Sequence, residues 1–298
     1  TGDAYVLTQR DYMSGNVQTA DSDKWYQVMT SASTPLENVV AVRGTPSGLI
    51  ALTSDGDVYT WGNNVYTGGG AAFANTVYAT QMDLTTVDGV VKMIGMTGKN
   101  SAYILTTDGK LYSLGNNEDR QLGDFSSIER TDWVRAQKSS TAGDYFTDVL
   151  WISPNEHSTF GASGDYGYAA INVIDSEYKL WAWGRNNGYM LGGSSSSASY
   201  DPMYMPGTGT GEYDLKETDN LLAVETGGHT SMTVRQCSGK YGYVGHRVNG
   251  SMGDGTNDSG NESKYNFEDT ESVRLCGAPG APIIRVEDKE DFYCVGAE

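Results

Sequence analysis

The stretch Asp55-Gly56-Asp57-Val58-Tyr59-Thr60-Trp61-Gly62-Asn63-Asn64 is the clearest copy of a phrase that occurs five times along the chain. The other copies are Asp108-Gly109-Lys110-Leu111-Tyr112-Ser113-Leu114-Gly115-Asn116-Asn117, Lys179-Leu180-Trp181-Ala182-Trp183-Gly184-Arg185-Asn186-Asn187, Tyr241-Gly242-Tyr243-Val244-Gly245 and Phe292-Tyr293-Cys294-Val295-Gly296. Their closing glycines are separated by 53, 69, 61 and 51 residues. A period this long predicts one supersecondary unit per repeat, and such units must stack to bury their faces.

Each repeat can be divided into four strands. In the second full unit, the apolar run 89–95 and the segment 102–106 predict two strands, and 111–115 and 132–136 predict two more. Between the second and third, Asp108-Gly109 predicts a type I′ hairpin turn with two positive-φ residues. Four-stranded antiparallel sheets repeated at this spacing predict an all-β protein with a β-propeller fold.

Three features occur together in these repeats. They are an apolar strand that ends in glycine, an Asp-Gly hairpin that leads into aromatic-x-Trp-Gly-x-Asn, and a Leu-Gly-x-Gly loop. The loop occurs as Gln121-Leu122-Gly123-Asp124, Met190-Leu191-Gly192-Gly193 and Ser251-Met252-Gly253-Asp254-Gly255-Thr256. In combination, the features resemble the regulator of chromosome condensation repeat family over nearly the whole chain. The resemblance implies a propeller of about six blades, or seven if the chain is a fragment.

The division of the chain follows from the repeats. We expect a single propeller domain over 1–298, with full blades at about 37–82, 89–136, 147–206 and 220–268. The segments 1–30 and 271–298 read as partial blades, because both ends of the chain fall in mid-blade. Either the ring closes irregularly or the chain is part of a longer chain or assembly, and we favour the second interpretation.

Composition narrows the classes of partner. The 298 residues include 20 basic and 38 acidic side chains, for a formal net charge of -18. This balance argues against nucleic acid, since phosphate binding needs clustered Lys and Arg. No apolar stretch is long enough for membrane insertion. The 38 glycines and 20 tyrosines on a lysine-poor background are typical of extracellular proteins, so we expect an extracellular, cell-surface or virion location.

Three cysteines, Cys237, Cys276 and Cys294, cannot form a complete disulfide framework. Cys276 and Cys294 fall in one repeat and could pair. The strand pattern, however, places another strand between them, which would make the span too wide for a disulfide. We favour the interpretation that these residues are small buried hydrophobic side chains.

Long insertions mark the candidate binding surface. Residues 153–167, 185–200 and 246–265 should project from one propeller face, because loops after first and third strands share a face, while 206–219 should project from the other. Such insertions commonly form the binding face of repeat proteins, although neutral drift also lengthens exposed loops. Five tyrosines in or beside them suit protein or glycan recognition, or are ordinary sheet-surface residues. They are Tyr166, Tyr168, Tyr189, Tyr200 and Tyr204.

Signals for chemistry are weak. Asp254, Asp258 and Glu262 are a weak calcium candidate in an oxygen-rich loop, and an unliganded acidic loop is the favoured alternative, so we predict no metal and no cofactor. The three histidines have no ligand partner at a useful spacing, and the chain has no Gly-x-Ser-x-Gly nucleophile motif or phosphate-binding glycine loop. We therefore predict a protein that is not an enzyme.

The function hypothesis follows from composition and repeats together. We expect a non-enzymatic propeller exposed outside the cell, as part of a surface adhesin or a virion tail or capsid appendage, that contacts a protein or glycan. The first alternative follows from the family resemblance, which implies guanine-nucleotide exchange on a small GTPase or another intracellular regulatory interaction. The second alternative is inhibition of a secreted enzyme.

Overall fold

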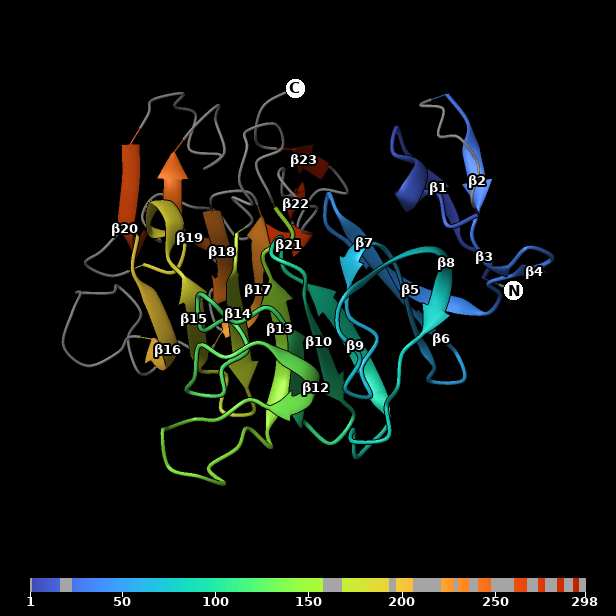
Figure 1. Ribbon diagram of the computed structural model, residues 1–298. Helices are drawn as coiled ribbons and strands as arrows, with labels where there is room; N and C mark the ends of the chain where they lie inside the picture. Colours follow the sequence, from blue (N-terminus) through green and yellow to red (C-terminus); the bar gives the residue numbers. More distant parts are fainter. Residues whose placement is uncertain are drawn as a thin grey trace.

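The computed structural model describes residues 2–16, 23–157, 168–192, 197–205, 221–227, 230–235, 241–247, 260–266, 273–276, 283–286 and 292–294. Four sheets each contain four antiparallel strands in sequence order, which confirms the predicted blades (Figure 1). The first sheet contains β5 (Val39–Gly44), β6 (Gly48–Thr53), β7 (Val58–Val65) and β8 (Ala74–Gln81). The second sheet contains β9 (Val91–Met96), β10 (Ser101–Thr106), β11 (Leu111–Gly115) and β12 (Arg130–Arg135). The third sheet contains β13 (Val149–Pro154), β14 (Ala170–Asp175), β15 (Leu180–Arg185) and β16 (Ser199–Met205). The fourth sheet contains β17 (Leu221–Gly227), β18 (Thr230–Arg235), β19 (Tyr241–Arg247) and β20 (Gly260–Asn266).

Smaller sheets occupy the two ends of the described chain. β1 (Tyr5–Leu7) pairs antiparallel with β2 (Trp25–Gln27), as the mid-blade start predicts. β21 (Val273–Cys276), β22 (Ile283–Val286) and β23 (Phe292–Cys294) form a three-stranded antiparallel sheet. A short hairpin of β3 (Met29–Ser31) and β4 (Thr34–Pro35), which the repeat pattern does not predict, precedes the first full sheet. Four complete and two incomplete blades agree with the predicted count of about six.

The first strand of each sheet is its inner strand and packs against the sheet before it. β9 contacts β5 and β6, β13 contacts β9 and β10, β17 contacts β13 and β14, and β21 contacts β17 and β18. Figure 1 shows this succession of sheets from blue through green and yellow to orange. Hydrophobic clusters fill the spaces between successive sheets, because each sheet is apolar on both faces.

The hairpin turns differ from the prediction. Gly109 has a φ of +82°, but Asp108 is not among the positive-φ residues, so the turn is not type I′. The backbone N–H of Gly109 donates to the carbonyl of Thr106 at 3.1 Å, and the N–H of Thr106 donates to the carbonyl of Lys110 at 3.0 Å. The connection is thus a three-residue loop with glycine in the left-handed position. A hydrogen bond of 2.5 Å from the Thr106 hydroxyl to Asp108 Oδ1 holds the aspartate in place.

The strand predicted between two of the cysteines is present. Ile283 of β22 pairs with Cys276 of β21 on one side and with Cys294 of β23 on the other. The two cysteine backbones are therefore two strand spacings apart, about 9–10 Å. This separation is too wide for a disulfide between them. Cys237 lies outside the described residues.

The sheets have two ends that face solvent. We call loop face the end that carries the connections after first and third strands, which include 45–47, 97–100, 116–129, 155–157 and 186–192. We call turn face the opposite end, which carries the tight hairpins after second strands. Helical structure among the described residues is limited to the 3-10 turns η1 (Asp11–Met13) and η2 (Asn187–Tyr189), and no helix there is long and apolar enough to cross a bilayer.

The glycine that closes the repeated phrase is required by close backbone contact, which a matched pair of variants can test. Gly184 has a φ of +91°, and a Cβ atom there would collide with the carbonyl of Ala169, the residue directly before the paired strand β14. Gly143 has a similar φ of +88°, but a Cβ atom there would meet nothing within 4 Å. We expect Gly143→Ala to cost about 1–2 kcal/mol through backbone strain alone. We expect Gly184→Ala to cost about 4 kcal/mol or more, measured by urea denaturation. Equal losses for the two variants would contradict this account.

Candidate functional site

The loops that follow the repeated phrase on the loop face are anchored by its asparagine. Asn117 Oδ1 accepts a hydrogen bond of 2.9 Å from the backbone N–H of Leu122. In the next repeat, Asn186 Oδ1 accepts one of 2.8 Å from the backbone N–H of Leu191. Leu122 and Leu191 are fully buried. The Gly-x-Asn of the phrase and the Leu-Gly of the following loop therefore act together. The asparagine side chain binds the backbone of the leucine, and the leucine side chain is buried.

Gln121 joins the second sheet to the third. Its backbone carbonyl accepts two hydrogen bonds of 2.8 Å, from the hydroxyl of Tyr103 in its own sheet and from the indole Nε1 of Trp183 in the next. Trp61 makes the equivalent contact one repeat earlier, where its Nε1 donates to the carbonyl of Met13 at 3.1 Å. The tryptophan directly before the closing glycine, Trp61 or Trp183, therefore binds the preceding unit.

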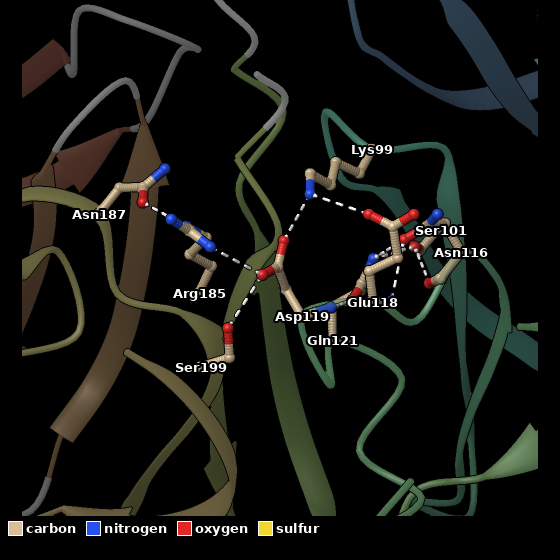
Figure 2. A network of polar contacts seen from close by, with 9 residues as sticks. All are labelled: Lys99, Ser101, Asn116, Glu118, Asp119, Gln121, Arg185, Asn187 and Ser199. Atoms are coloured by element: carbon tan, nitrogen blue, oxygen red, sulfur yellow. Dashed lines mark hydrogen bonds and ion pairs between the residues drawn. The ribbon is translucent and has the colours of Figure 1, made fainter. Parts of the chain in front are cut away.

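A buried carboxylate extends this junction on the loop face. Asp119 accepts a hydrogen bond of 2.9 Å from the hydroxyl of Ser199, and its carboxylate lies 2.7 Å from Lys99 Nζ and 3.2 Å from Arg185 Nη1. Figure 2 shows Asp119 between the two cations, with Lys99 on the side of the second sheet and Arg185 on the side of the third. Three side chains from two sheets therefore converge on the carboxylate of Asp119.

The surroundings of Asp119 keep it ionised. Burial raises the pKa of its carboxyl, but the hydrogen bond and charge of Lys99, with hydrogen bonds from Ser199 and Arg185, outweigh that effect and hold the pKa below its ordinary value. The backbone N–H of Asp119 donates to Gln121 Oε1 at 2.9 Å, and Gln121 Nε2 donates to Asn116 Oδ1 at 2.8 Å. The carboxylate and the loop that carries it are thus fixed by one continuous network.

A second ion pair crosses the same boundary. Arg120 Nη1 lies 2.6 Å from Asp201 Oδ2, which joins the loop after β11 to β16. Glu118, whose carboxylate lies 3.5 Å from Lys99 Nζ, keeps 73% of its side chain exposed. The arrangement presents a solvent-facing loop on a rigid base, which suits contact with another macromolecule.

The structure describes four of the five predicted tyrosines and places them in different surroundings. Tyr189 lies in η2 on the loop face, and Tyr200 lies opposite Gly184 at the loop-face end of β16. Tyr168 is buried, with its ring 5.0 Å from that of His157. Tyr204 lies at the turn-face end of β16, where its ring is 5.7 Å from Trp181. Tyr166 lies outside the described residues. A role of these tyrosines in binding remains a prediction.

The calcium hypothesis also stays a prediction. Asp254 and Asp258 lie outside the described residues, and the backbone of Glu262 is part of β20, opposite Gly245. Within the described part of the chain, no three His, Cys, Asp or Glu side chains group together in a way that could hold a metal ion.

Sequence reasoning missed Lys99, Asp119, Gln121 and Arg185. One signal was present, because Asp119 and Arg185 follow the closing glycine of consecutive copies by four residues and one residue. Two opposite charges near the same point of adjacent repeats indicate an ion pair between blades. That inference needs the order and orientation of the sheets, which the structure supplies.

Comparison with known proteins identifies the repeat. The family model "Regulator of chromosome condensation (RCC1) repeat" matches residues 49–67. The RCC1 domain-containing protein RUG3, mitochondrial, of Arabidopsis thaliana is 26% identical over 209 residues, which are 68% of this chain and 41% of that protein. The chain spans less than half the length of the curated relatives that it matches.

Solved structures share the fold. Human WBSCR16 aligns with a TM-score of 0.63 at 15% identity, over 97% of this chain and 75% of that one. Yeast RCC1 (Prp20) bound to Kap60 aligns with a TM-score of 0.60 at 16% identity, over 100% of this chain and 63% of that one. A second structure of Prp20p, from Saccharomyces cerevisiae and studied for its binding to Gsp1p and histones, aligns with a TM-score of 0.56 at 18% identity, over 86% of this chain and 56% of that one.

The predicted extracellular, cell-surface or virion location is wrong. The matched relatives include a mitochondrial protein, and the matched structures include one bound to Kap60. The glycines and tyrosines that suggested secretion have structural roles, such as the positive-φ glycines of turns and the core tyrosine Tyr103. The adhesin, virion and secreted-enzyme-inhibitor interpretations depended on that location and are not carried further.

Removal of the charge on Asp119 tests the network. Asp119→Asn leaves Lys99 and Arg185 without their shared counter-ion, so we expect a loss of about 3 kcal/mol in the free energy of unfolding at pH 7. The control Glu118→Gln removes only an exposed partner of the same lysine, at 3.5 Å and with 73% of its side chain exposed, and should change stability by about 0.5 kcal/mol or less.

The pH dependence of stability distinguishes a charge effect at Asp119 from a packing effect. Because the folded pKa of Asp119 is lowered, its contribution is fully present above the ordinary value of 3.8 and is lost as the pH falls through the folded pKa. Denaturant titrations should show the difference between wild type and Asp119→Asn shrinking in acid. A difference that stays constant down to pH 3 would assign the effect to packing instead.

Proposed function

The chain is an RCC1-type β-propeller, and on this premise we propose that it is a non-enzymatic protein-interaction module of an intracellular regulatory protein that binds its partner through the loop face. The observation that carries the proposal is the Asp119 network, which fixes loops of two sheets on one solvent-facing surface. A loop that is already fixed loses less conformational freedom on binding than a free one. Such a surface therefore supports affinity without a deep pocket.

The class of partner follows from what similar propellers bind. Prp20p binds Gsp1p and histones, and it has been crystallised with Kap60, so each known partner named there is a protein. The net charge of -18 favours a partner with a basic surface through electrostatic complementarity. We take a protein as the ligand, and glycan recognition has no support from these relatives.

Binding to three purified proteins tests this proposal. Gsp1p, core histones and Kap60 are each passed over the immobilised chain, and we expect saturable binding of at least one. The loop-face variant Glu118→Ala/Tyr189→Asn should weaken that binding about tenfold or more, because both positions lie on the proposed surface. Asparagine is chosen at Tyr189 because it tolerates the observed φ of +65°.

The matched control lies on the turn face. Asp55→Ala/Glu177→Ala removes two charges from hairpins at the opposite end of the sheets, and it should change the dissociation constant less than threefold. Circular dichroism and thermal unfolding establish that both double variants fold. If the turn-face variant weakens binding and the loop-face variant does not, the proposed surface is wrong. If none of the three proteins binds, the proposed partner class is wrong.

Guanine-nucleotide exchange is the second candidate function, because the family resemblance implies it and Prp20p binds Gsp1p. Exchange factors of this kind act by contact with the GTPase, so the rigid loop face suits that role too. The test is the release of a fluorescent GDP analogue from Gsp1p in the presence of the chain. A tenfold or greater acceleration that Glu118→Ala/Tyr189→Asn reduces would support exchange. Binding without acceleration would restrict the function to an interaction role.

A further inference from the structure

Three charged residues from different sheets meet at the loop-face end of the inner strands. Arg43 lies near the end of β5, Glu225 lies near the end of β17, and Glu156 follows β13 by two residues. The three positions belong to the first, fourth and third sheets. At the ends of the inner strands, they therefore bring together blades that are far apart in the sequence.

Glu156 is the most buried of the three. Its side chain is 10% exposed, whereas that of Arg43 is 51% exposed, and the Arg43 Nε to Glu156 Oε1 distance is 3.8 Å. The backbone N–H of Gly44 also donates to the carboxylate of Glu156. Both contacts come from the end of β5, so Glu156 links the first sheet to the third. A separation of 3.8 Å is longer than a charge-assisted hydrogen bond, so the ion pair offsets only part of the cost of burial.

Glu225 links the third sheet to the fourth. The hydroxyl of Ser153 on β13 lies 3.5 Å from Glu225 Oε2, and it accepts a hydrogen bond of 2.7 Å from the backbone N–H of Thr226. Trp151, also on β13, donates its indole Nε1 to the carbonyl of Val224 at 2.8 Å. Glu225 of β17 is thus held against β13, close enough for its charge to act on Glu156 and for Arg43 to act on it.

The charges in this cluster do not balance. Burial raises the pKa of Glu156 to about 7, an effect that Arg43 opposes and that the negative charge of Glu225 reinforces. Burial also raises the pKa of Glu225, against the opposing charge of Arg43 and the hydrogen bond from Ser153. The neighbouring His157 supplies no compensating charge near neutrality, because burial lowers its pKa.

We propose that Arg43, Glu156 and Glu225 form a proton-operated junction, in which a proton on Glu156 holds the first, third and fourth sheets together at the loop face. When Glu156 loses that proton, two buried carboxylates share one half-exposed guanidinium, and their repulsion loosens the contact between β5, β13 and β17. This inference does not depend on the identity of the partner. It makes the geometry of the loop face respond to pH near neutrality.

The sign of the effect follows from the direction of the titration. A carboxyl whose folded pKa is raised stabilises the fold in its protonated form, so the stabilisation is present at low pH and is lost as the pH rises through about 7. We expect the midpoint of thermal unfolding of the wild type to fall by a few degrees between pH 6 and pH 8.5. After correction for the intrinsic rise of amide exchange with pH, the protection factors of the amides in 221–227 should fall severalfold over the same interval.

The variant Glu156→Gln tests the junction directly. Glutamine has the shape of the protonated acid and cannot ionise, so the variant should keep the low-pH stability and the low-pH protection factors up to pH 8.5. The matched control is Glu177→Gln on the turn face, whose side chain is 65% exposed and which should keep the wild-type pH profile. If Glu156→Gln keeps the wild-type pH profile, the junction is not proton-operated.

A second variant acts in the opposite direction. Arg43→Gln removes the only cation of the cluster that opposes the burial effect at Glu156, so the pH at which stability is lost should move upward. The carboxyl titration of Glu156, followed by carbon NMR in the wild type, provides an independent readout. An upward shift in Arg43→Gln with a Glu156 midpoint near 7 supports the junction. An unchanged or lowered transition, or a Glu156 midpoint below 5, overturns it.

Discussion

The carbonyl oxygen of Gln121 is the acceptor on which the described loop face depends. It accepts hydrogen bonds from a phenol of its own sheet and an indole of the next, both at 2.8 Å, so one backbone atom links two blades. Neither donor could be left unpaired in this buried place without a cost of about 1–3 kcal/mol. The side chain of the same residue holds the backbone N–H of Asp119, which then gathers Lys99 and Arg185. Packing and polar contacts at this junction therefore reinforce each other.

The sheets also impose a constraint of their own. A blade that is apolar on both faces is stable only between two neighbours, which explains why hydrophobic clusters run from the first sheet to the fourth without interruption. The two-stranded sheet of β1 and β2 is the exception. Tyr5, Leu7 and Trp25 remain between 45% and 63% exposed there. Val6 of β1 packs against the cluster that contains Trp61, and the adjoining η1 and β3 contact β7 and β8.

Local signals explain how much of this fold was predictable. Alternating strands, Asp-Gly turns and closing glycines specify each sheet within some fifty residues, so the blades follow from the sequence. The type of turn did not follow, because aspartate tolerates both signs of φ and an Asp-Gly pair therefore fits either turn. The Asp119 to Arg185 contact spans 66 residues and depends on the orientation of adjacent sheets, which no local pattern contains. The predicted location was wrong for another reason, since glycine and tyrosine content reflects turns and packing rather than the cellular compartment.

The anchoring of Asn186 has a further consequence for the loop that follows it. Its side chain ties the backbone N–H of Leu191 and the carbonyl of Gly192 to the end of the sheet, and its own N–H is bound by the carbonyl of Ala198. The chain between Gly192 and Ala198 therefore starts and finishes at two fixed points. Segments of other lengths could be exchanged between those points by evolution or by protein engineering, while the blade beneath keeps its register. The propeller would serve in this way as a frame for displaying new loops.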